Sequence, residues 1–320
     1  MPVITDPPPQ YVVDDLDRLR RALDAEIPPR HLDRNLLVAT WNLRAFGDLT
    51  EKWTAGDDDT PKRDLHAVRC IAEVIGRFDV VGLQEVRGNI KALRHTLKCL
   101  GPDWGMILTD VTKGSDGNDE RMAFLFDTRR AKPSGLAAEL VVPVERDPAK
   151  IKPSAFNRQF ARTPYAVSFL AGDTTFILVT LHVLWGKKPE DRVGELGAIA
   201  EWLAEWARDA NAWHHNLIAL GDFNIDRKDD PLHAAFTSTG LRAPKELDDV
   251  PRTIFDDGEG RFYDQIAWFT GEDGVPKLSL DYRSAGGFDF TPHVLTGLDR
   301  QSLSWRVSDH MPLWVEFQNS

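Results

Sequence analysis

Leu-Ile-Ala-Leu-Gly-Asp-Phe-Asn-Ile-Asp, residues 217–226, is the most informative stretch of this sequence. Its first four residues are apolar and predict a short buried strand, after which Gly221 allows the backbone to turn. Asp222 and Asn224 would then emerge at the end of a rigid strand. A carboxylate and a carboxamide held there suit a divalent cation, a phosphate and an attacking water. A strand followed by an ordinary Asx turn explains the same residues, so this stretch alone leaves both interpretations open.

The segments around this strand predict a fold with both parallel and antiparallel pairing. Upstream, we expect strands at 36–41, 79–84 and 104–108 with helices at 62–78 and 87–100 between them, and then strands at 121–127, 136–142, 165–170 and 174–182 without long helices. Next come a helix at 190–211, the strand at 217–220, a helix at 231–238 and strands at 252–255, 264–270, 278–282 and 312–317. This mixture indicates an α/β (α+β) fold, in which two mixed sheets pack face to face with helices outside.

The first 34 residues differ from the rest of the chain. Proline clusters at 7–9 and 28–29 enclose an amphipathic helix at 12–27, whose apolar stripe is Leu16, Leu19 and Leu23. We expect residues 1–34 to form an N-terminal extension that packs on the main body through this stripe. No linker divides residues 35–320, so we expect them to form one domain.

The composition narrows the class of protein. The chain has 320 residues, 42% of them apolar, and no apolar run long enough to span a bilayer, so we expect a globular protein without stable membrane association. Its Pro-rich, acidic start does not resemble an export signal, which favours a cytoplasmic location. Cys70 and Cys99 have no His or Cys neighbours at metal-ligand spacing, so neither zinc nor a disulfide framework is indicated.

The formal net charge of -11 bears on nucleic-acid binding. It argues against broad, non-specific adhesion, which depends on a basic surface. It does not exclude an enzyme that acts on nucleic acid, because a divalent cation can neutralise phosphate locally.

Polar residues recur where the expected strands end. Each has a structural explanation when taken singly: His182 could be a satisfied core histidine, Glu85 could complement a helix N-terminus, and Asp309 could begin a turn. Together they supply what hydrolysis of a phosphodiester needs, namely cation ligands, a base, an acid and donors for the developing charge. The strand-end residues are Asn42, Gln84, Glu85, His182, Asp222, Asn224, Asp264, Asp309 and His310.

Short motifs containing these residues follow one another in a fixed order. They are Thr40-Trp41-Asn42-Leu43, Leu83-Gln84-Glu85-Val86, Leu181-His182, Gly221-Asp222-Phe223-Asn224, Tyr263-Asp264-Gln265-Ile266 and Ser308-Asp309-His310. This order resembles the endonuclease/exonuclease/phosphatase superfamily. Asp119-Glu120-Arg121 and Ala161-Arg162-Thr163-Pro164 make the chain similar to its DNase I-like members. The resemblance implies a four-layer sandwich of two sheets between helices.

The resemblance also implies a metal site. Glu85 would be the principal ligand of Mg²⁺, with Asn42 and Asp309 near it. Mn²⁺ or Ca²⁺ could take the place of Mg²⁺. Carboxylate and carboxamide oxygens are ligands that suit magnesium, so the implied site agrees with the chemistry of the residues.

The remaining roles follow from the same resemblance. His310 would be the base, oriented by Asp264, and His182 would be the acid or a donor to a phosphate oxygen, paired with Glu120. In such pairs the carboxylate fixes the imidazole tautomer and stabilises its protonated form. The residues that would position the substrate and the water are Asp222, Asn224 and Arg162.

For function, the resemblance implies a divalent-metal-dependent phosphodiesterase, and we expect a DNase I-like endonuclease with DNA as its nucleic-acid partner. A loop at 143–164 interleaves basic and aromatic residues and could follow a nucleic-acid backbone, although it could equally be a solvated loop. Trp185-Gly186-Lys187-Lys188 is a second possible contact. The alternatives are a phosphatase or phospholipid phosphodiesterase, or a catalytically inactive binding protein of the same fold. The sequence indicates no protein partner.

Overall fold

Two six-stranded sheets form the centre of the protein in the computed structural model, which describes residues 2–112, 118–140, 162–186, 188–208, 216–255, 258, 260–271 and 277–318. The first sheet has the order β11-β12-β1-β2-β4-β3 and the second has the order β5-β6-β7-β8-β10-β9. The strands of the first sheet are β1 (Asn35–Phe46), β2 (Val80–Arg87), β3 (Trp104–Leu108), β4 (Glu120–Asp127), β11 (Asp281–Gly287) and β12 (Leu313–Gln318). Those of the second are β5 (Lys132–Glu139), β6 (Tyr165–Ala171), β7 (Thr174–His182), β8 (Leu217–Asp222), β9 (Leu241–Arg242) and β10 (Asp264–Phe269).

Both sheets are mixed, as the sequence predicts. β1 pairs with β2 in parallel, and β7 pairs with β8 in parallel. The consecutive strands β3–β4, β5–β6 and β6–β7 pair in antiparallel fashion. Parallel and antiparallel pairing are both present as predicted, although the successive strands β4 and β5 lie in different sheets and do not pair.

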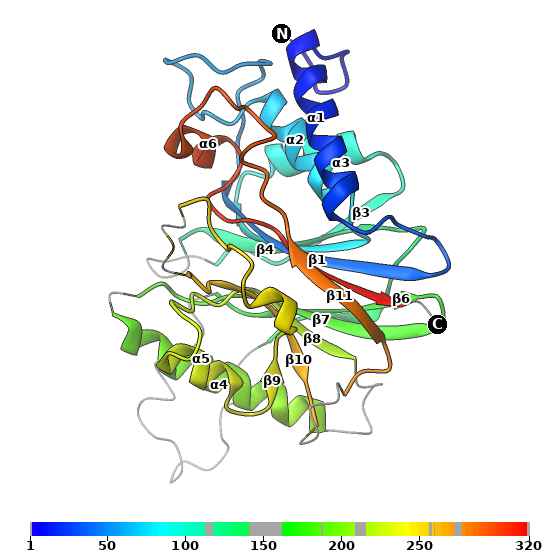
Figure 1. Ribbon diagram of the computed structural model, residues 1–320, viewed down its shortest axis with the longest axis vertical. Helices are drawn as coiled ribbons and strands as arrows, with labels where there is room; N and C mark the ends of the chain where they lie inside the picture. Colours follow the sequence, from blue (N-terminus) through cyan, green and yellow to red (C-terminus); the bar gives the residue numbers. More distant parts are fainter. Residues whose placement is uncertain are drawn as a thin grey trace.

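Helices cover the outer face of each sheet and complete four layers (Figure 1). The helices α1 (Gln10–Glu26), α2 (Leu65–Ile75), α3 (Lys91–Leu100) and α6 (Arg300–Arg306) lie on the side of the first sheet. On the side of the second sheet lie α4 (Pro189–Arg208) and α5 (Pro231–Thr237), and a short 3₁₀ turn, η1 (Lys245–Leu247), follows β9. The predicted four-layer sandwich is confirmed.

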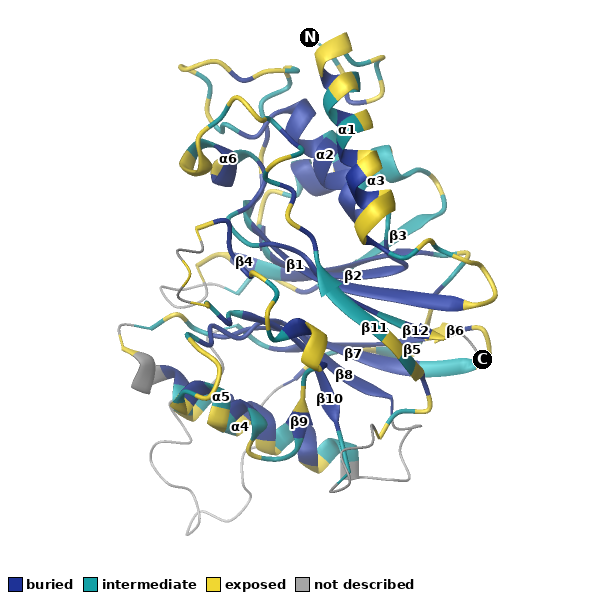
Figure 2. Ribbon diagram, viewed as in Figure 1, coloured by how far each residue is buried: buried dark blue, intermediate teal, exposed yellow. Residues whose placement is uncertain are grey.

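The two sheets approach each other closely in an apolar core (Figure 2). Phe124 and Leu220 belong to this core, and a Cβ atom on Gly82 would lie 2.4 Å from Leu220 Cδ1. One polar contact also joins the sheets, because the buried Gln84 donates to Thr180 Oγ1 at 2.9 Å. This contact lies one residue from Glu85 and links the strand ends of the two sheets.

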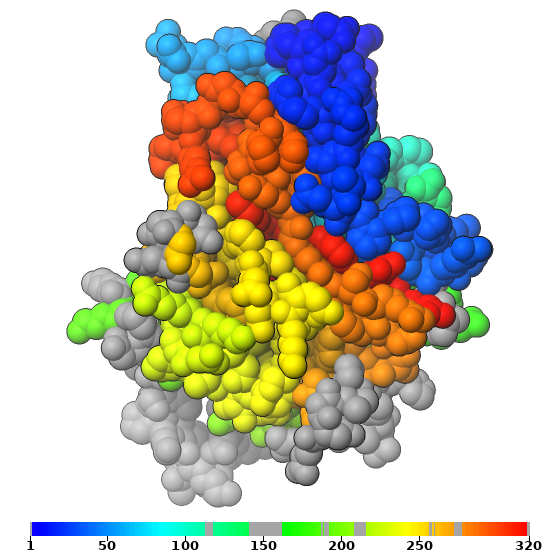
Figure 3. Space-filling model, in the orientation of Figure 1, coloured from blue at the N-terminus to red at the C-terminus, as the bar shows by residue number. Residues whose placement is uncertain are grey.

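The N-terminal helix α1 packs on the first half of the protein. Its stripe of Leu16, Leu19 and Leu23 is buried in the same cluster as α2, which confirms the predicted packing. Arg18 also donates to the carbonyl oxygen of His293 at 3.1 Å. In Figure 3 the blue N-terminal residues lie beside the orange segment that precedes α6. No helix among the described residues is long and apolar enough to cross a membrane.

Several predicted elements differ from the structure. The segment 252–255 is not a strand, because it pairs only through a single bridge between Thr253 and His310. The strand expected at 278–282 begins at Asp281 and continues to Gly287 as β11. The helix expected at 87–100 begins only at Lys91, since β2 runs on to Arg87. α6 and β9 were not predicted.

Gly221 is required at the end of β8 for a physical reason. Its φ is +136°, and a Cβ atom would lie 2.1 Å from the carbonyl oxygen of Leu181 on the neighbouring strand. We expect Gly221→Ala to lower the free energy of unfolding by about 3 kcal/mol or more, because overpacking and backbone strain add.

Denaturant unfolding of Gly135→Ala provides the matched control for this change. Gly135 has a φ of +121° but no atom of the described residues within 4 Å of its Cβ position, so this variant carries the strain without the clash. Equal losses of stability in the two variants would contradict the clash at Leu181.

Candidate active site

The ends of neighbouring strands bring the predicted site residues together. In the second sheet His182 on β7 and Asp264 on β10 both lie opposite Asp222 on β8. In the first sheet Asn42 on β1 lies opposite Gln84 on β2. Strand register therefore fixes these positions before any side chain is considered.

The backbone at these strand ends leaves regular geometry. Glu85 and Asn224 have φ values of +58° and +51°, and Arg44 and Ala45, in the irregular end of β1, are also left-handed. The register between β2 and β4 shifts between Leu83 and Val86, so Glu85 lies in a β-bulge. Non-glycine residues hold such conformations only where the surrounding structure enforces them, and they gather at functional sites.

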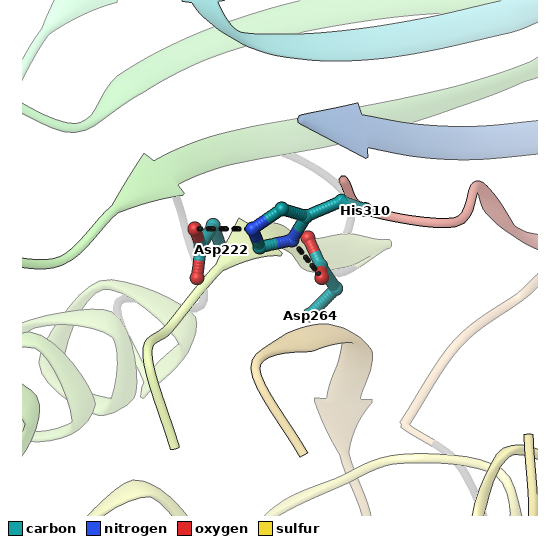
Figure 4. Close-up of side chains that lie close together, drawn as sticks. All are labelled: Asp222, Asp264 and His310. Atoms are coloured by element: carbon teal, nitrogen blue, oxygen red, sulfur yellow. Dashed lines mark hydrogen bonds and ion pairs between the residues drawn. The ribbon is translucent and has the colours of Figure 1, made fainter. Parts of the chain in front are cut away.

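His310 forms the first histidine–carboxylate pair (Figure 4). Its Nδ1 lies 2.7 Å from Asp264 Oδ2, and its Nε2 lies 3.9 Å from Asp222 Oδ2. Trp41 Nε1 donates to the His310 carbonyl oxygen at 2.8 Å, which ties this segment to β1. The imidazole is thus held with Nδ1 on one carboxylate and Nε2 turned toward another.

His182 lies beside two carboxylates in a similar way, although its contact with the first is an ion-pair distance and not a hydrogen bond. Its Nδ1 lies 3.2 Å from Glu120 Oε2, and its Nε2 lies 3.6 Å from Asp222 Oδ2. The carboxylate of Asp222 therefore faces the Nε2 atoms of both His182 and His310. It is held there by the backbone N–H of Asn224, which donates to Asp222 Oδ1 at 2.9 Å.

Arg162 contacts the second histidine–carboxylate pair through Glu120. Its Nε is 2.6 Å from Glu120 Oε2, and its Nη1 is buried without a hydrogen-bond partner in the part of the chain that the structure describes. Asn118 donates to the other oxygen of Glu120 at 2.6 Å, and Arg87 lies 3.3 Å from that oxygen. Arg162 is therefore ion-paired with Glu120 through Nε, and its Nη1 makes no hydrogen bond to the residues that the structure describes.

Glu85 and Asp309 are the oxygen ligands that could hold a cation. The Glu85 carboxylate accepts hydrogen bonds from the backbone N–H of Ala45 at 2.8 Å and from Asn42 Nδ2 at 3.1 Å. Asp309 Oδ2 pairs with Arg44 at 3.1 Å, whereas Asp309 Oδ1 is buried and has no hydrogen-bond partner among the described residues. A buried carboxylate oxygen without a partner beside a second carboxylate fits a hard cation such as Mg²⁺.

Asn42 lies beneath this cation site. Besides Glu85, its Nδ2 donates to Asp222 Oδ2 at 3.0 Å, so one amide connects the two carboxylates. Its Oδ1 accepts the backbone N–H of Arg44 at 3.0 Å and has a second lone pair. Asn42 is fully buried, so it orients its neighbours from behind the cavity wall.

The electrostatics of the site favour bound positive charge. Burial alone would raise the pKa of Glu85, but the charges of His182 and His310 and the hydrogen bonds to the carboxylate lower it to about 2. Burial also opposes a charged imidazole, yet the carboxylates of Asp264 and Asp222 raise the pKa of His310 well above its ordinary value. Ligand oxygens at Glu85 are therefore ionised at neutral pH.

A second group could also contact a cation. Asp222, Asp264 and His310 each offer an atom within 4.8 Å of the others (Figure 4). In the structure these atoms are engaged with one another and with Asn42 and Asn224. Mg²⁺ prefers oxygen ligands, which favours Glu85 and Asp309 over a group that contains an imidazole.

A cavity of about 420 Å³ joins these features. Asn42 and Asp264 lie behind its wall. The predicted site residues that line it are Glu85, Glu120, Arg162, His182, Asp222, Asn224, Asp309 and His310. The other lining residues are Asn118, Trp185, Thr253, Phe255, Arg261 and Tyr263.

Arg63 supports the site, although no local pattern in the sequence points to it. Its buried guanidinium donates to the carbonyl oxygens of Leu43 at 2.9 Å and Ala45 at 3.1 Å, which follow Asn42. It also donates to Arg306 at 3.0 Å and Val307 at 3.2 Å, which precede Ser308. One side chain thus joins the segment that holds Glu85 to the segment that carries Asp309 and His310.

Comparison with known proteins gives the family. The model of the Endonuclease/Exonuclease/phosphatase family matches residues 39–310. The chain belongs to this family. A protein from Thioalkalivibrio sp. (strain K90mix), named Deoxyribonuclease, is 28% identical over 302 residues, which cover 89% of this chain and 72% of that protein.

Solved structures share the fold at low sequence identity. The Bacteroides thetaiotaomicron mannosyl-6-phosphatase is 20% identical, with a TM-score of 0.59 over 88% of this chain and 99% of that one. The human Nocturnin catalytic domain with bound sulfate is 16% identical, with a TM-score of 0.56 over 92% and 100%. D. rerio TDP2 complexed with a single-strand DNA product is 15% identical, with a TM-score of 0.54 over 88% and 98%. The family therefore supports a phosphoester hydrolase, while these structures support the fold alone.

The basic and aromatic loop expected to contact nucleic acid lies mostly outside the described residues. The structure describes its end from Arg162 onward, but not 141–161. Lys187 also lies outside the described residues, whereas its neighbours Trp185, Gly186 and Lys188 lie within them.

Proposed function

We propose that this protein is a Mg²⁺-dependent phosphodiesterase that hydrolyses DNA, in the manner of a DNase I-like endonuclease. The observation that carries the proposal is the pair of imidazoles on either side of Asp222. Each has Nδ1 on its own carboxylate, at 2.7 Å for His310 and 3.2 Å for His182, and Nε2 toward Asp222. A space with one base and one acid facing it is what an in-line displacement at phosphorus requires.

In the proposed reaction, a bond forms between the water oxygen and phosphorus while the bond from phosphorus to the leaving oxygen breaks. His310 Nε2 accepts the proton of the water, and Asp264 stabilises the imidazolium. His182 Nε2 gives a proton to the leaving oxygen, with Glu120 holding its ring. When bound at Glu85 and Asp309, a divalent cation would neutralise phosphate charge and favour the neutral imidazole of His310.

Two other groups bind and orient the substrate in this proposal. Arg162 donates to a phosphate oxygen through Nη1, since its Nε is engaged by Glu120. Asp222 and Asn224 orient the water between the two imidazoles. Asn42 holds the carboxylates of Asp222 and Glu85 in place through Nδ2, and its Oδ1, which accepts the N–H of Arg44, would face the bound cation with its second lone pair.

The choice of DNA rests on the relative named Deoxyribonuclease, which is similar over most of this chain. Phosphomonoesters and phospholipids are the competing substrates, because the same residues could act on any exposed phosphate ester.

A substrate panel tests this choice. Purified protein with Mg²⁺ is given single-stranded and duplex DNA, RNA, nucleotides, mannose 6-phosphate, inositol phosphates and sphingomyelin, and kcat/KM is measured for each. We expect the highest kcat/KM for DNA. A higher value for a phosphomonoester or for sphingomyelin would contradict the proposed substrate but leave the proposed site intact.

A further inference from the structure

Trp185 stands exposed at the wall of the catalytic cavity. Its side chain follows β7 three residues after His182, and 53% of the residue is accessible to solvent. Phe255, at 40%, is a second exposed aromatic residue that lines the cavity. Single apolar residues on a surface need no explanation, but two exposed aromatic rings in one polar cavity indicate a ligand with a flat apolar part.

The indole of Trp185 is held in place from behind. The guanidinium carbon of Arg192 lies 4.9 Å from the centre of its ring. Arg192 is itself fixed, because it is 3% exposed, pairs with Asp226 at 2.7 Å and donates to the carbonyl oxygen of Asn224 at 2.5 Å. A ring backed by a cation that is held in this way loses little conformational freedom when a ligand stacks on it.

The same ring is connected to the proposed base. Trp185 meets Tyr263 in an edge-to-face contact with the ring centres 5.5 Å apart. Tyr263 in turn lies 5.9 Å from the His310 ring, measured between centres. A group stacked on Trp185 therefore lies next to the position proposed for the scissile phosphate.

We propose that Trp185 is a stacking platform for an unpaired nucleobase next to the scissile phosphodiester, so that the enzyme prefers DNA strands with accessible base faces. This inference rests on the proposed function. Nucleobases present a flat π-face a short distance from each phosphate, and stacking on an aromatic side chain tolerates any base. Inside a duplex both faces of each base are covered by neighbours, so a platform of this kind selects single strands, ends or locally unpaired sites.

Kinetics of Trp185 variants test the proposal. kcat/KM is measured on a single-stranded oligonucleotide and on the same oligonucleotide with tetrahydrofuran abasic residues on both sides of the cleaved bond. We expect Trp185→Ala to lower kcat/KM on the base-bearing strand by roughly 5- to 150-fold, mainly through KM, and to affect the abasic strand much less. Trp185→Phe should retain most of the activity, whereas Trp185→Leu, which is apolar without a ring, should resemble alanine.

A control and a binding measurement accompany the kinetics. Leu170→Ala removes an exposed apolar side chain on β6 that does not line the cavity. This variant should leave kcat/KM unchanged on both the base-bearing and the abasic strand. In a His310→Ala background, which prevents turnover, fluorescence anisotropy of a labelled single strand should show weaker binding when Trp185 is replaced by alanine. Thermal melting verifies that each variant is folded.

The outcomes separate this inference from the proposed function. Cleavage of DNA by the native protein with equal kcat/KM in the alanine and phenylalanine variants would overturn the stacking platform alone. Equal losses of kcat/KM in Trp185→Ala on the base-bearing and the abasic strand would also overturn the stacking platform. No cleavage of any nucleic acid by the native protein in Mg²⁺ would overturn the proposed function and this inference with it.

Discussion

Replacing His310 by alanine is expected to lower kcat for DNA hydrolysis by about 10²- to 10⁴-fold, the range in which positioned general bases contribute. The imidazole is the group whose Nε2 faces Asp222 while Nδ1 is held by Asp264 at 2.7 Å. No other described side chain combines a base with this orientation except His182, which lies on the other side of Asp222. Activity is measured in single-turnover experiments with saturating Mg²⁺, so that binding and chemistry are separated.

Two further variants make this result specific. His31→Ala removes an exposed histidine of the N-terminal extension and should behave as the native protein. Asp264→Asn keeps the shape of the orienting side chain but removes its charge, and it should also lower kcat strongly because the tautomer and the imidazolium lose their support. Retention of kcat within tenfold in His310→Ala would exclude His310 as the base.

Replacing Glu85 by glutamine should abolish metal binding at working concentrations. We expect Mg²⁺ affinity to fall by more than about 100-fold, because even groups that only support a metal ligand contribute 10- to 100-fold. The exchange removes one charge with little change in size. Isothermal titration calorimetry measures the affinity, and Mg²⁺-dependent stabilisation against thermal unfolding gives a second readout that does not require activity.

Glu205→Gln is the matched control for the metal site. Glu205 is exposed on α4, on the side of the second sheet that faces away from the first sheet, and its replacement should leave Mg²⁺ affinity unchanged. If Glu85→Gln binds Mg²⁺ as tightly as this control does, the cation lies elsewhere. In that case, loss of Mg²⁺ binding in Asp264→Asn would place the cation at the group of Asp222, Asp264 and His310.

The elements that the sequence predicts well are those with continuous apolar runs. The bounds of β7 agree with the prediction at both ends, and β8 starts where the run at Leu217 begins. α6 was missed because it is only seven residues long and has no wide apolar stripe, although Asp299 caps it by accepting the N–H of Ser302. β11 was displaced because its pairing with β12 depends on a distant strand and not on its own polar, glycine-containing sequence.

The same distinction applies to the site. Residues that follow directly after buried strands, such as Asp222 and Glu85, can be identified from order along the chain, since strand ends meet at one edge of a sheet. The contribution of Arg63 could not be identified from the sequence, because it depends on a contact with a segment far away in the chain. The contribution of Asn118 could not be identified either, because it depends on how Glu120 is placed by its distant partners. The support of Trp185 by Arg192 likewise exists only after α4 packs beside β8.

Conversion of supercoiled plasmid to nicked circles measures DNA hydrolysis at this site most directly. The native protein should nick the plasmid in Mg²⁺, lose this activity in EDTA and regain it when Mg²⁺ is restored, whereas His310→Ala and Glu85→Gln should remain inactive throughout. Absence of Mg²⁺-dependent nicking by the folded native protein would contradict an endonuclease that acts on plasmid DNA, and nicking that persists in both variants would contradict metal-dependent hydrolysis by these residues.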